Sequence, residues 1–153
     1  VYSWGVLHHT GALWKAIGNA CSKVEPGGLL FLAIYNDQGW LSKYWWFIKK
    51  TYVSSPNFIK LFLIFFFCLF YSTSLFLLDI LRFRNPLRRY SVDARGMRFY
   101  IDLVDWIGGF PFEVSRPDLL VDQLERLGFR LLKKKTIGNK HGCNEFLFQK
   151  VID

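Results

Sequence analysis

The chain has 153 residues, enough for one domain, and its 52% apolar and 19% aromatic content supplies ample material for a core. The formal net charge is +8, yet the position of that charge argues against a nucleic-acid-binding protein. Much of it adjoins one hydrophobic segment, and the aromatic residues are not interleaved with it as they would be in a single-strand binding groove. These basic residues are Arg82, Arg84, Arg88, Arg89, Arg95 and Arg98.

The first part of the chain predicts a βαβ unit of an open α/β sheet. An apolar strand begins at Val1 and leads within a few residues into a loop that contains two histidines. Residues 11–24 carry apolar side chains three and four positions apart, which predicts a helix with Thr10 as its N-cap. Leu29–Ile34 is a continuous apolar run, typical of a parallel strand covered on both faces. The first strand is apolar on both faces too, so we predict that it is not an edge strand and that its neighbours precede Val1.

Residues 38–95 break this βα rhythm and predict a helical insertion. Leu41–Tyr52 reads as one helix, and Pro56 separates it from a second helix over Phe58–Arg84. The first helix has an interfacial character that comes from Trp45, Trp46, Lys49 and Lys50. After Pro86, Leu87–Phe99 is predicted to be a basic, mobile connector.

Within the second predicted helix, Leu61–Leu78 contains no charged residue. As a helix it would extend roughly 27 Å, slightly less than a bilayer core of about 30 Å. It can span a membrane, dip into one leaflet, or form a helical lid buried against a pocket and a partner subunit. Its phenylalanines spread around the helix, which favours contact with lipid or a hydrophobic partner through residues 58–89. They are Phe62, Phe65, Phe66, Phe67 and Phe70.

Residues 96–153 are predicted to complete the domain of residues 1–37. Pro117–Leu127 is an amphipathic helix that Gly128 stops. Phe129–Ile137 and Cys143–Val151 alternate as two strands, joined by a turn of hairpin composition.

Candidate functional residues follow both predicted parallel strands, at the edge where such sheets bind ligands. His8 and His9 follow the first strand, and either imidazole can accept a proton from a substrate. The structural alternative is that one histidine caps the following helix and the other fills space. Tyr35 and Asn36 end the second strand, where they line a substrate pocket or simply form a good strand exit.

The segment Asp102–Glu113 contains the motif Gly-Gly-Phe-Pro, which demands an irregular, tightly turned backbone. We interpret it as a substrate-side element in which two aromatic residues form a wall and one acidic residue makes a polar contact. The alternative is a structural corner with Glu113 capping a helix. The aromatic candidates are Trp106 and Phe112, and the acidic candidates are Asp105 and Glu113.

The cysteines and histidines do not predict a metal site. Cys21, Cys68 and Cys143 lack metal-ligand spacing, and we expect three reduced, buried thiols of a cytosolic protein. His8 and His9 have no acidic ligand pattern beside them.

Ser3–Gly11, followed by Glu25–Gly28 and Leu29–Asn36, resembles the fourth strand, fourth helix and fifth strand of class I S-adenosylmethionine-dependent methyltransferases. Asp102–Glu113 and Gly142–Phe146 resemble a bacterial subgroup grouped loosely with ubiquinone-pathway methylases. The resemblance implies the C-terminal part of a Rossmann-like methyltransferase sheet with an apolar helical insertion. It also implies that the last strand is antiparallel.

The resemblance further implies roles for individual residues. Backbone groups of Trp4, Gly5, Val6 and Leu7 would lie near the methionine end of S-adenosylmethionine, and one of the two imidazoles would face the substrate. The family's glycine-rich loop and ribose-binding acid would precede Val1, so we expect the 153-residue chain to be inactive alone.

The expected reaction is methyl transfer to a small or lipid-like acceptor, in a cytoplasmic protein that can associate with the inner membrane. The alternative is a non-catalytic, membrane-associated α/β module. A nicotinamide-dependent enzyme is less consistent with the sequence, because no Gly-x-Gly-x-x-Gly follows a strand.

Overall fold

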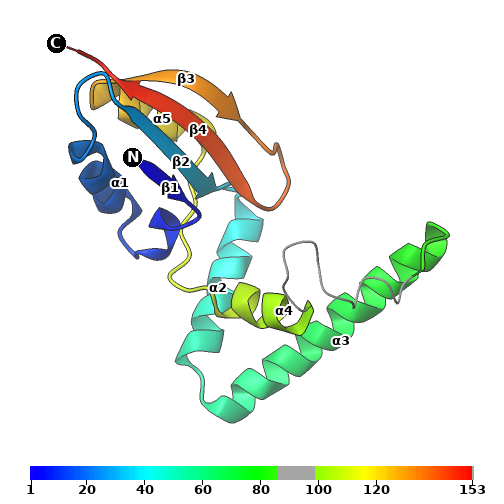
Figure 1. Cartoon of the computed structure of the whole chain (residues 1–153). Coiled ribbons are helices and arrows are strands. Elements are labelled where there is room, and N and C mark those ends of the chain that lie inside the picture. Colours follow the sequence, from blue (N-terminus) through cyan, green and yellow to red (C-terminus); the bar gives the residue numbers. More distant parts are fainter. Residues whose placement is uncertain (86–98, 153) are drawn as a thin grey trace. The chain divides into compact units, whose positions relative to one another are not determined.

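A computed structural model describes residues 1–85 and 99–152, which form two compact units (Figure 1). The first, the sheet unit, comprises residues 1–46 and the residues from 111 onward. The second, the helical unit, is Phe47–Phe110. It extends further toward the C-terminus than the predicted insertion of residues 38–95. The predicted connector Leu87–Phe99 lies outside the described residues except at its last position.

The sheet unit contains a mixed four-stranded sheet with the order β1-β2-β4-β3 (Figure 1). β1 (Tyr2–Trp4) pairs in parallel with β2 (Leu29–Tyr35). β4 (Cys143–Lys150) lies antiparallel between β2 and β3 (Phe129–Lys135). The chain is therefore an α/β protein, and the predicted hairpin and its antiparallel final strand are confirmed.

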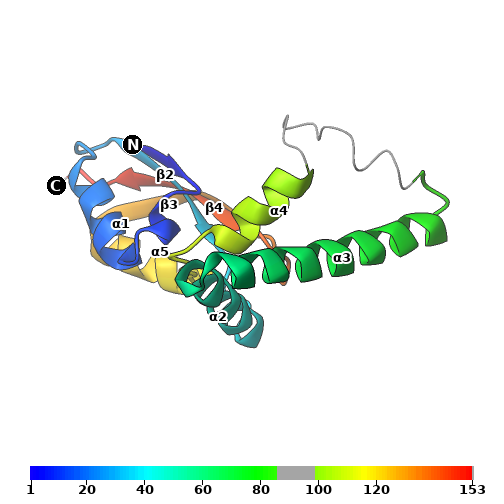
Figure 2. The same ribbon diagram turned by 90° about the horizontal axis from the view of Figure 1, so that it is seen from below.

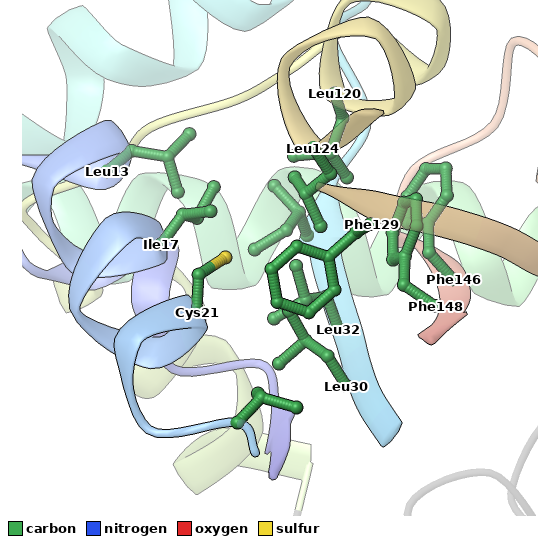
Figure 3. Packing of buried hydrophobic residues seen from close by; sticks show 12 residues of the cluster. Leu13, Ile17, Cys21, Leu30, Leu32, Leu120, Leu124, Phe129, Phe146 and Phe148 are labelled. Atoms are coloured by element: carbon green, nitrogen blue, oxygen red, sulfur yellow. The ribbon is translucent and has the colours of Figure 1, made fainter. Parts of the chain in front are cut away.

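Two helices cover one face of this sheet. α1 (Leu13–Ser22) and α5 (Pro117–Arg126) lie on the same side of it (Figure 2). Alternate residues of a strand point to one face, and here those of β2 and β4 pack against both helices (Figure 3). The buried strand residues are Leu30, Leu32, Ile34, Phe146 and Phe148, and their helix partners are Leu13, Ile17, Cys21, Leu120 and Leu124. Burying each large apolar side chain contributes about 1.5–3 kcal/mol.

The opposite face of the sheet carries exposed aromatic residues. Tyr2 is 72% exposed and Trp4 56% exposed, and the Tyr2 ring stacks on Phe31 at a centroid distance of 5.0 Å. Within the described chain, β1 pairs only with β2 and is the edge strand. The sequence predicted an interior strand here, whereas β1 is an edge strand of the described sheet. The pairing of the edge of β1 that faces away from β2 stays a prediction.

The start of α1 also differs from the prediction. The helix begins at Leu13, because Gly11 has φ +75°, a left-handed conformation that cannot continue into a right-handed helix. Thr10 is not the N-cap. Its hydroxyl donates to the Leu7 carbonyl at 2.8 Å, within the preceding turn.

Three helices carry the insertion: α2 (Trp40–Ser54), α3 (Asn57–Leu81) and α4 (Phe99–Gly108). The helix over Phe99–Gly108 was not predicted, and it takes up the first part of the segment Asp102–Glu113. Leu103 and Ile107 are four positions apart and both buried, so the helical period prevails until the glycine pair. The irregular backbone is confined to the residues after Gly108.

Lys49 is not an interfacial residue, contrary to the sequence interpretation. It is 1% exposed, donates to the Trp106 carbonyl, and places Nζ 4.1 Å from the centroid of the Trp106 ring. Burial lowers the pKa of Lys49 to about 8, although the charge of Asp105 offsets part of this effect. Lys49 and Trp106 thus join α2 to α4 within the helical unit.

Candidate active site at the carboxyl ends of β1 and β2

The chain turns sharply where β1 ends. Gly5 has φ +73°, and its N–H donates to the Ala33 carbonyl of β2 at 3.2 Å. A single 3-10 turn, Leu7–His9, follows directly. The structure therefore places both histidines at the carboxyl end of the parallel strand pair, as predicted.

His8 is fully buried beside Tyr35. The two ring centroids are 3.8 Å apart, and the backbone N–H of Tyr35 donates to His8 Nδ1 at 3.3 Å. Since Nδ1 accepts, the neutral imidazole carries its proton on Nε2. Through this bond His8 fixes the end of β2, and its role in proton transfer stays a prediction.

His9 has the opposite tautomer. Its Nδ1 donates to the Pro111 carbonyl at 2.7 Å, so in the neutral ring Nε2 is an acceptor. The ring is half-buried and lies edge-on to His8 and Tyr35, at centroid distances of 4.6 and 5.5 Å. A carbonyl that holds Nδ1–H fixes the ring orientation and makes Nε2 the basic atom. Of the two histidines, His9 has the geometry of a general base.

A segment distant in sequence, Pro111–Ser115, completes this edge. The Glu113 N–H donates to the His8 carbonyl at 3.0 Å, and the Ser115 N–H donates to the Tyr35 carbonyl at 3.0 Å. Gly11 has φ +75°, which favours glycine, and a Cβ there would lie 3.3 Å from Pro111 Cγ, so a larger residue would also have to displace Pro111 slightly. Phe112 is buried, with its ring centroid 5.4 Å from that of Tyr35. Tyr35 and Phe112 form the aromatic side of the site.

Glu113 caps α1. Its Oε1 accepts from the N–H of Leu13, the first helical residue, at 3.1 Å. A carboxylate at this place satisfies an otherwise unpaired donor and complements the helix dipole. Its Oε2 is buried and has no hydrogen-bond partner among the described residues. The structural alternative for Glu113 is therefore realised, while one carboxylate oxygen remains an acceptor at the site.

Replacing Glu113 by Ala should lower the free energy of unfolding by about 1 kcal/mol, because the Leu13 N–H loses its acceptor. Glu113→Gln keeps an acceptor oxygen and loses only the charge, so we expect a loss of about 0.3–1 kcal/mol. Urea unfolding of the two variants and the wild type measures both effects. Wild-type stability in Glu113→Ala would show that the capping bond contributes nothing.

Asn36 is used by the fold. Its Nδ2 donates to the Gly138 carbonyl at 2.7 Å, and its Oδ1 accepts from Asn144 Nδ2 at 2.9 Å. Both side-chain groups thus tie the end of β2 to the β3–β4 turn. This geometry favours the strand-exit alternative over orientation of a substrate group.

The remaining predicted residues divide between the two units. In the sheet unit, Trp4 and Val6 are more than half exposed, Leu7 packs against the core, and a Cβ at Gly5 would meet nothing within 4 Å. Ligand atoms can therefore approach this backbone. In the helical unit, Asp105 and Trp106 lie on α4 and take part in its packing around Lys49.

The described residues contain no group of three His, Cys, Asp or Glu side chains that could hold a metal ion. All three cysteines are free; Cys21 is buried, and Cys68 and Cys143 are half-buried. Burial raises the pKa of Cys21, and burial with the charge of Glu145 raises the pKa of Cys143 to about 11. Neither of these thiols supplies a thiolate near neutral pH.

Comparison with protein-family models, curated proteins and solved structures gives no match to this chain. The site is therefore interpreted from its own geometry. Sequence reasoning missed three of its parts: Gly11, the Pro111 carbonyl and Ser115. The Gly-Gly-Phe-Pro motif was the signal that pointed to this segment, but not to its partners.

Proposed function

We propose that the chain is part of an S-adenosylmethionine-dependent methyltransferase that acts on a small or lipid-like acceptor, with His9 as the general base. The observation that carries this proposal is the His9–Pro111 bond at the carboxyl end of β1, which leaves Nε2 as the basic atom. Ligands of open α/β sheets bind at this edge.

The strand arrangement also supports the proposal. If β1 and β2 correspond to the family's fourth and fifth strands, β3 and β4 are the last two, and the final strand is expected to be antiparallel. β4 is antiparallel to both of its neighbours. In the family that the chain resembles, most of the cofactor is bound by a glycine-rich loop and a ribose-binding acid, and we find neither pattern in these 153 residues.

The residues present fit the methionine end of the cofactor. The Gly5 backbone is open to close approach, and Glu113 Oε2 retains acceptor capacity for a donor group. When bound, S-adenosylmethionine supplies a methyl group that is already activated as a sulfonium. The protein then contributes mainly alignment. His9 Nε2 takes the proton that a hydroxyl or amine of the acceptor loses, and Pro111 stabilises the resulting imidazolium through Nδ1–H.

The test is methyl transfer by the protein in its full genomic length, with radiolabelled S-adenosylmethionine and an extract of bacterial lipids and small metabolites as acceptor. We expect label in an extractable product. Absence of label with the extract, under conditions where the protein is folded, would contradict the proposal.

A second candidate function is a non-catalytic, membrane-associated α/β module. The observation that favours it is the exposure of α3, because no residue in the most apolar part of this helix is buried. Binding of S-adenosylmethionine separates the two candidates, because only the methyltransferase requires it.

A further inference from the structure

α3 is the only helix among the described residues that is long and apolar enough to cross a membrane, and none of its most apolar 18-residue window is buried. Most of its exposed residues recur three and four positions apart on one side of the helix, here called the α3 face, while Tyr71 and Leu78 are exposed on another side. Its members are Phe58, Leu61, Phe62, Phe65, Phe66, Leu69, Phe70, Phe76, Leu77, Ile80 and Leu81. Thr73 lies among them, but its hydroxyl donates to the Leu69 carbonyl at 2.6 Å and is satisfied within the helix.

The sequence suggested that the phenylalanines spread around the helix, but in the structure most of them lie on the α3 face. Phe62, Phe65, Phe66 and Phe70 are each more than half exposed, whereas Phe67 lies on the other side of the helix and is half-buried. Within the helical unit, α3 packs against α4. The α3 face is therefore the most exposed side of a helix that is apolar on its other sides as well, where Tyr71 and Leu78 are also exposed.

The C-terminal end of α3 has the composition of a membrane interface. Arg82, Phe83 and Arg84 follow the helix, and all three are exposed. Phe83 is 99% exposed and has φ +53°, a left-handed conformation that disfavours a bulky residue. An aromatic ring between two guanidinium groups suits the headgroup region of an anionic bilayer.

The sheet determines how many times the insertion can cross a membrane. β2 precedes the insertion and β4 follows it, and the two strands pair from Leu29↔Gln149 to Tyr35↔Cys143. Both ends of the insertion must therefore lie on the same side of any membrane. A spanning α3 would require a second span to return the chain.

Among the described residues of the insertion, no helix other than α3 is long and apolar enough to be a second span. A span needs about 20 mostly apolar residues. α2 has 15 residues and contains Lys43, Lys49 and Lys50, and α4 has 10 residues. The sequence from 82 to 98 contains six arginines. A single crossing by α3 is thus incompatible with the paired sheet.

We propose that α3 lies in the plane of an anionic lipid bilayer, with the α3 face in the acyl boundary and both ends of the helix on the same side. Arg82 and Arg84 then contact the phosphate groups of the lipids. Binding of α3 to lipid does not require methyl transfer, so the vesicle-binding experiment and the methyl-transfer assay can fail independently. A second copy of the chain on the α3 face is the competing occupant that the experiment must exclude.

The first experiment is flotation of the full chain after cell-free synthesis in the presence of vesicles. We expect binding to vesicles of phosphatidylcholine mixed with phosphatidylglycerol, and weaker binding to phosphatidylcholine alone. Phe62→Gln/Phe65→Gln/Phe66→Gln should weaken binding more than about 100-fold, since each buried phenylalanine contributes roughly tenfold. Arg82→Gln/Arg84→Gln should weaken it roughly 30-fold in low salt.

A matched control replaces three exposed leucines outside α3, Leu119, Leu127 and Leu132, by Gln; this variant should bind as the wild type does. Wild-type protein that does not float would overturn the proposal, as would a discrete dimer that the three phenylalanine substitutions convert to a monomer. An equal loss of binding in the control variant would also overturn the proposal, because vesicle binding would then not depend specifically on α3.

The second experiment separates an in-plane helix from a spanning one. Single cysteines at Asn57 and Asn85, at the two ends of α3, are introduced after the native cysteines are replaced by Ala. An impermeant maleimide is added to sealed vesicles. We expect both positions to react from outside without lysis. Reaction of only one position before lysis would overturn the in-plane arrangement.

Discussion

Replacing His9 by Ala in the full-length protein should lower kcat for methyl transfer about 10²–10⁴-fold, the usual contribution of a general base. The affinity for S-adenosylmethionine should change little, because the proposed role of His9 lies on the acceptor side. The rate of label transfer and the cofactor dissociation constant measure the two effects separately.

His8 provides the matched comparison. His8→Ala removes a fully buried ring and the acceptor of the Tyr35 N–H. We expect it to lower stability by about 2–4 kcal/mol, since it combines a cavity with an unsatisfied buried donor. Full activity of His9→Ala on the native acceptor would show that His9 is not a base and that the loop serves only as a backbone support.

Replacing Phe148 by Ala should destabilise the sheet unit by about 3–5 kcal/mol, because the side chain is completely buried beneath α1 and α5. Leu147 is its neighbour on the opposite face and is only half-buried. Leu147→Ala should therefore cost about 1 kcal/mol or less. Denaturant unfolding of both variants measures the difference between the two faces.

The difference in stability loss between Phe148→Ala and Leu147→Ala also tests whether the opposite face of the sheet is exposed. Equal losses at Phe148 and Leu147 would contradict a core confined to one face. The result would then mean that the face of Tyr2 and Trp4 is covered as well.

Local sequence patterns predicted much of the fold. The helical spacing of residues 11–24, the apolar run of β2 and the alternation around the β3–β4 turn each depend on near neighbours, and all three elements form. Helix α4 was missed, because the glycine and proline residues that follow it drew more weight than the spacing of Leu103 and Ile107. The irregular backbone predicted for Gly-Gly-Phe-Pro forms after Gly108.

The sequence predicted where the site lies, but not which side chains contact one another within it. The sequence located His8 and His9 at the strand edge, since the carboxyl ends of parallel strands are recognisable from the βα order. It could not tell the two rings apart, because the Pro111 carbonyl that fixes His9 lies 102 positions away. Local sequence patterns also could not reveal the contact of Glu113 with Leu13, 100 positions apart, or that of Lys49 with Trp106, 57 positions apart.

Binding of S-adenosylmethionine to the protein in its full genomic length tests the central claim most directly, by calorimetric titration. The methyltransferase account predicts a dissociation constant in the micromolar range for the full-length protein and no measurable binding by the 153-residue chain. Wild-type affinity should persist in His9→Ala. A folded full-length protein that binds no S-adenosylmethionine at millimolar concentration would contradict the account.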